Sequence, residues 1–411
     1  MNEPALRFPE FDGEWKEKPL GSLVETVTSG SRDWAQYYSN TGAKFIRMTN
    51  IPRDGIQLML SDLKYVELPT TGTEGARTSL QSGDILVSIT AELGKIGLVP
   101  HDLGEAYINQ HTALVRPQKK EVVPQFLAQL LATRSSNKRL NRLNDSGAKA
   151  GLNLGTVRAF KVCLPKPDEQ KKIAAFLGVV DARIAALRDR QAGLERYKRG
   201  LMQALFSQRL RFTKPDGTAF PDWEKRNLSF YLSEPKARNR DLSFSKDDVL
   251  SVSGDVGCVN QIEHMGRSYA GVSVKDYHIV RTGDVVYTKS PLKLNPYGII
   301  KANFGRDGIV STLYAVYRPT DKADALFIHY YFSLDDNLNR YLRPIVRKGA
   351  KNDMKVNNTD VLGDAVFFPS RDEQAKIADA LSAMDTKIAA VTGQLDRMQA
   401  FKKGLLQQMF V

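Results

Sequence analysis

A long internal repeat is the feature that most limits how this chain can fold. Residues 164–206 and 368–410 align without a gap at an offset of 204 residues, and 17 of the 43 aligned positions are identical. Unrelated helical segments do not reach this identity, so the chain carries two copies of one unit. We therefore expect a fold assembled from two similar parts.

Weaker similarity extends the repeat upstream of each copy. SGDILVSI at 82–89 matches TGDVVYTK at 282–289, and INQHTALVRP at 108–117 matches IVSTLYAVYRP at 309–319. The matching segments keep their order and nearly their spacing. The chain is therefore expected to run as a globular part, a long helix, a second globular part and a second long helix.

Both globular parts have the patterns of mixed α and β structure. Short β-rich segments bounded by Gly, Pro or Asp occur at 45–51, 84–90 and 112–117. Apolar residues recur at helical spacing in 122–136 and again in 327–342. The predicted fold class is α+β.

The two long repeat segments carry a heptad seam, in which apolar residues alternate three and four positions apart. This spacing predicts a long helix that buries one face against another helix. Lys198 and Lys402 occupy matching seam positions in the two copies. The seam residues are Ile173, Leu177, Val180, Ile184, Leu187, Leu194 and Leu201 in the first segment, and Ile377, Leu381, Met384, Ile388, Val391, Leu395 and Leu405 in the second.

The start of each long helix has its own signature. Asp168 and Asp372 stand where an N-cap is expected, and Glu169 and Glu373 fall in the first turn, which the helix dipole favours. A helix of about 39 residues would reach roughly 58 Å.

Two such helices in one chain can bury their seams against each other. Antiparallel pairing would put the globular parts at opposite ends of a rod, in a pseudo-twofold tandem repeat with an antiparallel coiled coil. The alternative is that each helix packs on its own globular part or on another protein. The matching length and register of the seams favour pairing within the chain.

The composition narrows the functional classes. A net charge of +13 and a pI near 9.5 favour a polyanionic partner such as nucleic acid, although many proteins are basic for no specific reason. Cys163 and Cys258 are the two cysteines, and neither lies in a C-x-x-C pair, so we expect no structural metal and no disulfide. The N-terminus has no signal-peptide pattern and no apolar run approaches a membrane span, which predicts a cytoplasmic protein.

Motifs for catalysis and cofactor binding are missing from the sequence. There is no phosphate-binding G-x-x-x-x-G-K-[ST] loop and no G-x-G-x-x-G after a strand. Asn295-Pro296-Tyr297 has no accompanying glycine-rich loop, so 294–298 is predicted to be a turn. Acidic and Lys residues at 12–16 and 222–225 are too crowded for a metal-dependent nuclease. We therefore predict no catalytic residue and no metal site.

The candidate DNA contacts are polar residues after predicted strands and basic residues before each long helix. Basic groups among Ser, Asn and Gly suit phosphate contact, and paired donors and acceptors suit base edges. The alternative is a solvated helix face and ordinary turns. The candidates are Arg47, Thr49, Asn50, Ser88, Thr90, Lys95, Asn109, Gln110, His111 and Lys149 in the first half, and Lys289, Ser290, Lys293, Asn295, Arg347, Lys348, Lys351 and Lys355 in the second.

The two copies have diverged unequally. The long segments remain closely similar, whereas the globular parts share only scattered motifs. Duplicated readers with one scaffold and different loops would bind two different DNA sequences.

Three motifs in a fixed order carry a family resemblance. RFPEFDGEW, Gly-Asp-Ile-Leu-Val and LPKPDEQKKIAAFL appear in the first half, and FPSRDEQAKIADAL opens the second long segment. This order resembles the DNA specificity subunit (S subunit, HsdS family) of type I restriction-modification enzymes over nearly the whole chain. The second Gly-Asp strand departs from the pattern, because it continues Val-Val-Tyr.

The resemblance implies two target-recognition domains, each reading one half of a split site in double-stranded DNA, with the paired helices setting the spacing. It also implies two methylation (M) subunits that carry AdoMet and methylate adenine, and restriction (R) subunits that use ATP and Mg. No cofactor would be bound by this chain, which would be non-catalytic by itself.

The domain boundaries expected from these patterns are as follows: a first target-recognition domain at 1–163, a first spacer helix at 164–208, a second domain at 209–367 and a second spacer helix at 368–411. Two other functions compete with DNA recognition. A pure assembly scaffold would not retain DNA in a salt-dependent way. A self-sufficient methyltransferase would transfer a methyl group from AdoMet unaided.

Overall fold

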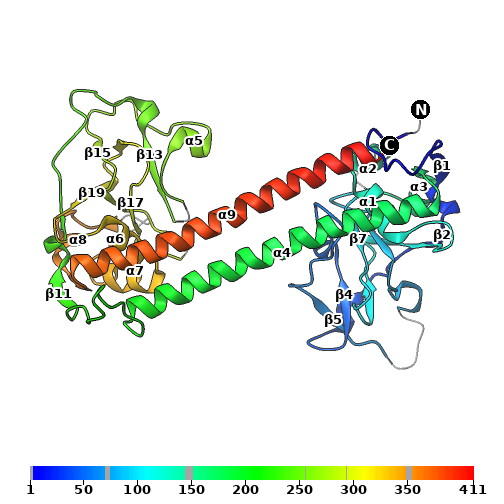
Figure 1. Ribbon diagram of the computed structural model, residues 1–411, viewed down its shortest axis with the longest axis horizontal. Coiled ribbons are helices and arrows are strands. Elements are labelled where there is room, and N and C mark those ends of the chain that lie inside the picture. Colours follow the sequence, from blue (N-terminus) through cyan, green and yellow to red (C-terminus); the bar gives the residue numbers. More distant parts are fainter. Residues whose placement is uncertain (1–2, 70–74, 144–150, 255, 293, 349–353) are drawn as a thin grey trace. The chain divides into compact units, whose positions relative to one another are not determined.

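The structure is a computed structural model of the 411-residue chain, and it falls into two compact units. The first comprises Met1–Arg188 with Gly393–Val411, and the second comprises Asp189–Thr392. Helices and sheets occupy separate segments in both units, which confirms the α+β class (Figure 1). The structure describes residues 3–69, 75–143, 151–254, 256–292, 294–348 and 354–411.

The first unit is built on a four-stranded antiparallel sheet with the order β2-β9-β6-β7. A second sheet has the order β3-β5-β4-β8, in which β4 and β8 run parallel, and β1 pairs with β10. The strands are β1 (Lys16–Pro19), β2 (Val24–Ser29), β3 (Tyr38–Ser39), β4 (Ala43–Ile46), β5 (Lys64–Val66), β6 (Ile85–Ser88), β7 (Ile96–Leu98), β8 (Ala106–Ile108), β9 (Thr112–Pro117) and β10 (Lys161–Leu164).

The second unit repeats this plan. Its main sheet has the order β12-β19-β16-β17, so strands that match in sequence occupy matching places in the two units. Two-stranded pairs β13-β14, β15-β18, β20-β21 and β11-β22 complete it. The strands are β11 (Glu224–Asn227), β12 (Leu232–Ser233), β13 (Leu250–Ser253), β14 (Gly257–Asn260), β15 (His278–Val280), β16 (Val285–Thr288), β17 (Ile299–Ala302), β18 (Gly308–Val310), β19 (Tyr314–Pro319), β20 (Arg347–Lys348), β21 (Met354–Lys355) and β22 (Ala365–Phe368).

Short helices cover the sheets, and they are more broken than the sequence pattern predicts. The single helix expected over 122–136 is divided at Thr133, where α1 ends. The same residue is the N-cap of α2, because its hydroxyl accepts a hydrogen bond from Ser136 N. The helices are α1 (Pro124–Ala132), α2 (Arg134–Arg142), α3 (Leu154–Ala159), α5 (Gln261–Met265), α6 (Ala325–Tyr331), α7 (Asp335–Leu342) and α8 (Asp360–Gly363).

The two long helices are α4 (Pro167–Phe206) and α9 (Arg371–Met409). The predicted N-caps are wrong, because Asp168 and Asp372 are the second residues of these helices rather than their caps. The first residue of α4 is Pro167. Proline is tolerated at this position, because the N–H of the first helical residue makes no hydrogen bond within the helix. The predicted first-turn acids, Glu169 and Glu373, are confirmed.

A buried ion pair fixes the start of each long helix. Arg7 donates from Nε and Nη2 to the two oxygens of Glu169, both at 2.8 Å. In the second unit Arg211 donates to Glu373 in the same way, at 3.1 and 2.9 Å. Both carboxylates are buried, so the paired hydrogen bonds offset the cost of removing them from water.

Within each unit a segment of α4 lies beside a segment of α9 (Figure 1). In the second unit Gln191 Nε2 donates to Thr392 Oγ1 at 3.0 Å, and Lys198 pairs with Asp385 at 2.5 Å. Seven residues forward along α4 therefore correspond to seven residues backward along α9, so these segments run antiparallel. In the first unit Lys402 pairs with Asp181 at 2.5 Å.

Most of the predicted seam residues are removed from solvent, whereas coiled-coil geometry in the strict sense stays a prediction. Leu194, Leu201 and Ile388 are partly buried. The buried seam residues are Ile173, Leu177, Val180, Ile184, Leu187, Ile377, Leu381, Met384, Val391, Leu395 and Leu405.

Two histidines, the buried His278 and the partly buried His329, make the second unit sensitive to acid. Burial, together with the nearby charges of Arg238 and Lys289, lowers the pKa of His278 to about 4. Burial, with Lys301 and Lys198 nearby, lowers the pKa of His329 to about 3. Both side chains are therefore neutral in the folded unit at neutral pH.

We predict that this unit loses stability as the pH falls from 6.5 toward 4.5. The unfolded chain takes up protons on these histidines near pH 6.5 while the folded unit does not, so unfolding is favoured by about 1 kcal/mol per pH unit for each histidine. Hydrogen exchange resolved by unit would measure the slope. The double variant His278→Phe/His329→Phe should flatten it, and an unchanged slope would contradict the assignment.

None of the helices in the described ranges is long and apolar enough to cross a membrane.

Candidate DNA-binding surface

The repeated Gly-Asp and Arg-Pro motifs are the two ends of one ion pair. Arg116 at the end of β9 donates to both oxygens of Asp84, at 2.8 and 2.7 Å, and Asp84 also accepts from Gln81 N. Arg318 and Asp284 repeat the contact in the second unit, at 3.0 and 3.2 Å. Because both carboxylates are buried beside a central strand, the motifs hold each sheet rather than bind a ligand.

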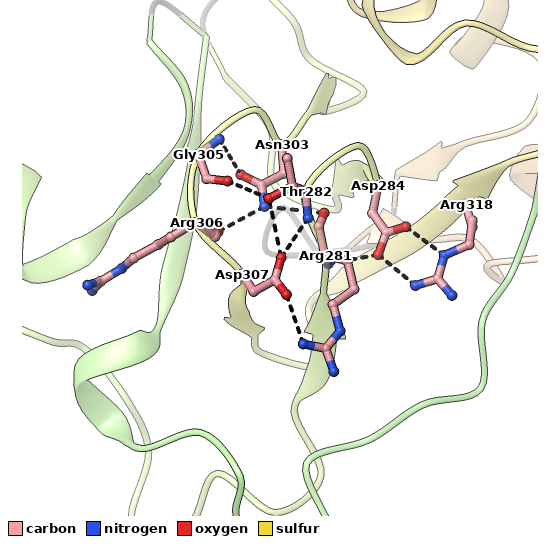
Figure 2. A network of polar contacts seen from close by, with 8 residues as sticks. All are labelled: Arg281, Thr282, Asp284, Asn303, Gly305, Arg306, Asp307 and Arg318. Carbon is pink, nitrogen blue, oxygen red and sulfur yellow. Dashed lines mark hydrogen bonds and ion pairs between the residues drawn. The ribbon is translucent and has the colours of Figure 1, made fainter.

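A polar network surrounds Asp284 just before β16 (Figure 2). Arg281 N donates to Asp284, and the Arg281 guanidinium pairs with Asp307 at 2.8 Å. A surface hollow of about 520 Å³ borders this network and reaches Arg371, which pairs with Asp324. These arginines are matched by carboxylates within the chain, so the hollow is a poor site for an anion.

Arg47 and Asn50 support a loop in the first unit. The Arg47 guanidinium pairs with Asp62 at 3.0 Å, and Asn50 donates to the carbonyls of Met59 and Asp62. Asn50 is buried, so its prediction as a base contact is corrected to a structural role. Thr49 between them is exposed.

Ser88 and Lys95 belong to the β6–β7 connection. Ser88 is buried, accepts from Lys95 N at 2.8 Å and donates to the carbonyl of Glu92. Its polar atoms are used inside the turn, so its prediction as a base contact is also corrected. Lys95 pairs with Glu92 at 2.5 Å and is largely buried.

Thr90 follows β6, and it comes together in the first unit with Asn109, Gln110 and His111 of the turn between β8 and β9. His111 Nδ1 is 2.8 Å from Thr90 Oγ1, and His111 Nε2 is 3.1 Å from Gln110 Nε2. Asn109 Oδ1 accepts from His111 N at 3.1 Å. All four side chains are partly exposed, so this cluster can meet a ligand.

In the second unit the predicted contacts after β16 are spread along one loop. Ser290 is exposed, and burial lowers the pKa of the partly buried Lys289. Asn295 accepts from Gly298 N at 3.1 Å, which confirms the predicted turn. Gly298 is required there, because its φ is +93° and a Cβ would lie 2.1 Å from Thr288 O.

The remaining basic candidates fall partly outside the described residues. Arg347 is exposed on β20, while Lys348 and Lys355 lie on the paired strands β20 and β21. Lys149, Lys293 and Lys351 lie outside the described residues.

Exposed cations lie on the second short helix of each unit, within the basic segments predicted to contact phosphate, although the candidate residues named above do not include them. Arg134, Lys138 and Arg142 follow one another at intervals of four along α2, which aligns them on one helix face. Arg340 and Arg343 lie at the end of α7 and are also exposed. No ion pair involves these five side chains within the described residues, and the spacing of four in the sequence was the available signal.

Within the described ranges, no group of three or more His, Cys, Asp or Glu side chains lies close enough to hold a metal ion.

Comparisons with known proteins agree in one family. Residues 12–196 match the type I restriction modification DNA specificity domain. A putative type I restriction enzyme MjaX specificity subunit from Methanocaldococcus jannaschii is 22% identical over 98% of this chain and 95% of that protein. The type I restriction enzyme EcoBI specificity subunit from Escherichia coli is 32% identical over 42% of this chain and 35% of that protein.

Solved structures show the same fold over the full length. The S subunit of a type I restriction-modification system from M. genitalium has a TM-score of 0.59 at 12% identity, covering 100% of this chain and 99% of that one. A chain from a study of assembly and conformational transition in the type I restriction-modification system has a TM-score of 0.52 at 16% identity, covering 96% of this chain and 97% of that one. Residues 12–196 of this chain are therefore similar to a type I restriction modification DNA specificity domain, and the chain as a whole has the fold of the solved S subunit.

Proposed function

We propose that this chain is the DNA specificity subunit of a type I restriction-modification system and that it recognises a bipartite site in double-stranded DNA, one half-site for each unit. One observation carries the proposal: the two units share a framework and differ at the turns that this framework exposes. The sheets have matching strand orders and matching Asp–Arg ion pairs. The turn before β9 reads Asn-Gln-His, whereas the turn before β19 reads Ser-Thr-Leu. Two units with matching sheets and different exposed turns are suited to binding two different DNA sequences.

The exposed cations of α2 and α7 would supply the phosphate contacts. Such contacts fix the position of a protein on the duplex without reading its sequence. Arg134, Lys138 and Arg142 present three charges on one face of α2, and the chain carries a net charge of +13. Each contacted phosphate releases counterions, so retention of DNA should weaken steeply as salt rises. A pure assembly scaffold would show no such dependence.

The long helices are proposed to recruit the methylation and restriction subunits. Tyr197 and Phe401 occupy equivalent positions 204 residues apart, one in each unit, and both are exposed. Phe401 lies over a groove that also contains Leu187 and Met398. Two equivalent exposed aromatic residues suit two copies of one partner, as expected for two M subunits.

Catalysis is assigned to the partners in this proposal. AdoMet would be bound by the methylation subunits, and ATP and Mg by the restriction subunits, because this sequence has neither phosphate-binding nor AdoMet-binding loops. The chain itself would bind no cofactor and act in the cytoplasm as a non-catalytic subunit.

Replacing residues 20–160 with residues 228–364 of the same chain tests the division of labour. The two segments end on equivalent backbone hydrogen bonds, Leu20 N to Phe160 O at 2.7 Å and Leu228 N to Asp364 O at 2.9 Å. The exchange also leaves the Arg7–Glu169 pair intact. We expect one half-site to change to the sequence of the other, and that other half-site to stay the same.

Sequencing of methylated sites in cells that carry the complete system would measure this outcome. The reciprocal exchange, residues 20–160 placed into the second unit, is the matched control and should change the opposite half-site. A change in both half-sites, or in neither, would refute one reader per half-site.

A further inference from the structure

The turn between β8 and β9 holds one side chain in a fixed orientation at the surface. Thr90 reaches the turn from the end of β6 and contacts His111, which in turn contacts Gln110. Ile89 N donates to His111 O at 3.1 Å and secures the backbone of the turn. Because two strands and a side-chain relay hold it, Gln110 is constrained before any ligand arrives.

Gly30 closes the back of this turn. A Cβ at position 30 would lie 2.1 Å from Ile108 O and 2.4 Å from the Asn109 carbonyl carbon. Backbone atoms cannot yield to such a contact, so only glycine lets the chain before the turn approach it. The turn therefore has little room to shift.

The contact between Gln110 and His111 restrains the amide of Gln110. The Gln110 atom that faces the ring is Nε2, and an amide nitrogen only donates hydrogen bonds. In this orientation His111 Nε2 accepts and Nδ1–H donates to Thr90 Oγ1, and the rotated amide with the other ring tautomer keeps the same two contacts.

Gln110 keeps one donor and one acceptor for an outside partner. Within the described residues, Oε1 accepts no hydrogen bond and the second amide hydrogen has no acceptor. A glutamine amide presents this pair in one plane, which matches the N6 donor and N7 acceptor of adenine in the major groove. The contact with His111 holds this amide in place at the surface.

The equivalent turn in the second unit has different chemistry on the same backbone. Lys289 N donates to Leu313 O at 3.2 Å, just as Ile89 N donates to His111 O. Leu313 replaces His111 and is 64% exposed. An exposed aliphatic side chain offers no hydrogen bond, but it can contact a thymine methyl group.

We infer that Gln110 reads an adenine in the half-site of the first unit, and that His111 and Thr90 are positioning residues that orient its amide. This inference rests on the proposed function, because it requires that the first unit reads bases. It adds the base that is read, the residue that reads it and the contact that presets the reader.

The test is selection of bound sequences by the purified full-length chain from double-stranded DNA randomised across both half-sites. The unmodified chain should enrich an adenine at one position of the first half-site. Gln110→Ala should reduce that preference roughly 5- to 150-fold, the range for loss of one bidentate base contact, with the other positions unchanged. His111→Phe keeps Gln110 but removes its acceptor, so it should relax the same position.

Leu313→Ala is the matched control, because it alters the equivalent turn and should affect only the other half-site. The inference is overturned if Gln110→Ala leaves every preference intact, or relaxes a position that does not hold adenine. It is also overturned if His111→Phe relaxes a different position. If the unmodified chain enriches no sequence at all, the proposed function itself fails, which is a distinguishable result.

Discussion

Replacing Lys402 with methionine is expected to destabilise the first unit by about 3 to 5 kcal/mol, the cost of leaving a buried charge without its partner. The Lys402 and Asp181 side chains are only 9% and 15% exposed. Asp181 also accepts from Gln129 Nε2 at 2.7 Å, so it is tied both to α9 and to the globular part. Without Lys402 the carboxylate would be buried with one neutral hydrogen bond.

The repeat supplies a matched control for this variant. Lys198 and Asp385 form the equivalent pair 204 residues away, and Tyr330 takes the place of Gln129 at 2.6 Å. These side chains are 21% and 45% exposed, so water screens the charge and Lys198→Met should cost about 1 kcal/mol or less. Hydrogen exchange in each unit would measure both losses.

A double variant separates pairing from packing at this position. Asp181→Leu together with Lys402→Met removes both charges, and it should recover much of the stability lost by Lys402→Met alone. Equal losses for Lys402→Met and Lys198→Met, or a double variant no more stable than Lys402→Met, would show that the buried charge is not the cause.

Lengthening both long helices by one heptad is expected to abolish recognition of the original site and create a site with a longer spacer. Residues 183–189 would be duplicated after 189, and residues 387–393 after 393. Each helix gains roughly 10 Å, which corresponds to as much as about three base pairs. If the two readers can no longer bind together, affinity for the original site should fall about 100-fold or more. Mapping of methylated sites would show the new spacer with both half-sites unchanged.

Both helices must be lengthened because their contacts are in register. With seven residues inserted into α4 alone, the two ion pairs could no longer form together. If Lys402 stayed paired with Asp181, Lys198 would be shifted by seven residues relative to Asp385, and the reverse would hold if Lys198 stayed paired. The matched insertion keeps every existing pair. A spacer that stays the same length, or half-sites that change, would contradict a spacing role for the helices.

Local periodicity explains what the sequence could predict of the fold. The heptads of 164–206 and 368–410 mark the two long helices, and the repeated strand motifs mark the matching sheets. Features decided by single residues were harder to predict. Pro167 moves the start of α4 ahead of the expected cap, and Thr133 breaks one expected helix into two.

Residue type was a weaker guide to the site, because burial depends on tertiary packing. Asn50 and Ser88 have the right chemistry for base contact, yet both are buried and bonded within their own loops. The contact between Thr90 and His111 joins residues 21 apart in sequence. Aligning the two halves could have identified Leu313 as the counterpart of His111.

The hydrogen bond between the two ends of the first unit has a consequence for the gene. Leu6 N donates to Gln408 O at 2.9 Å, and the ring of Trp15 lies 6.4 Å from that of Phe410. The backbone is therefore almost a closed loop, and a short linker between the ends would complete it. A circularly permuted gene beginning at Gln208 would place Arg211 near the new start, in the position that Arg7 has now. The permuted chain would end just after α4, whereas the present chain ends just after α9. The order in which the two units are encoded is thus free to change while the folded protein stays the same.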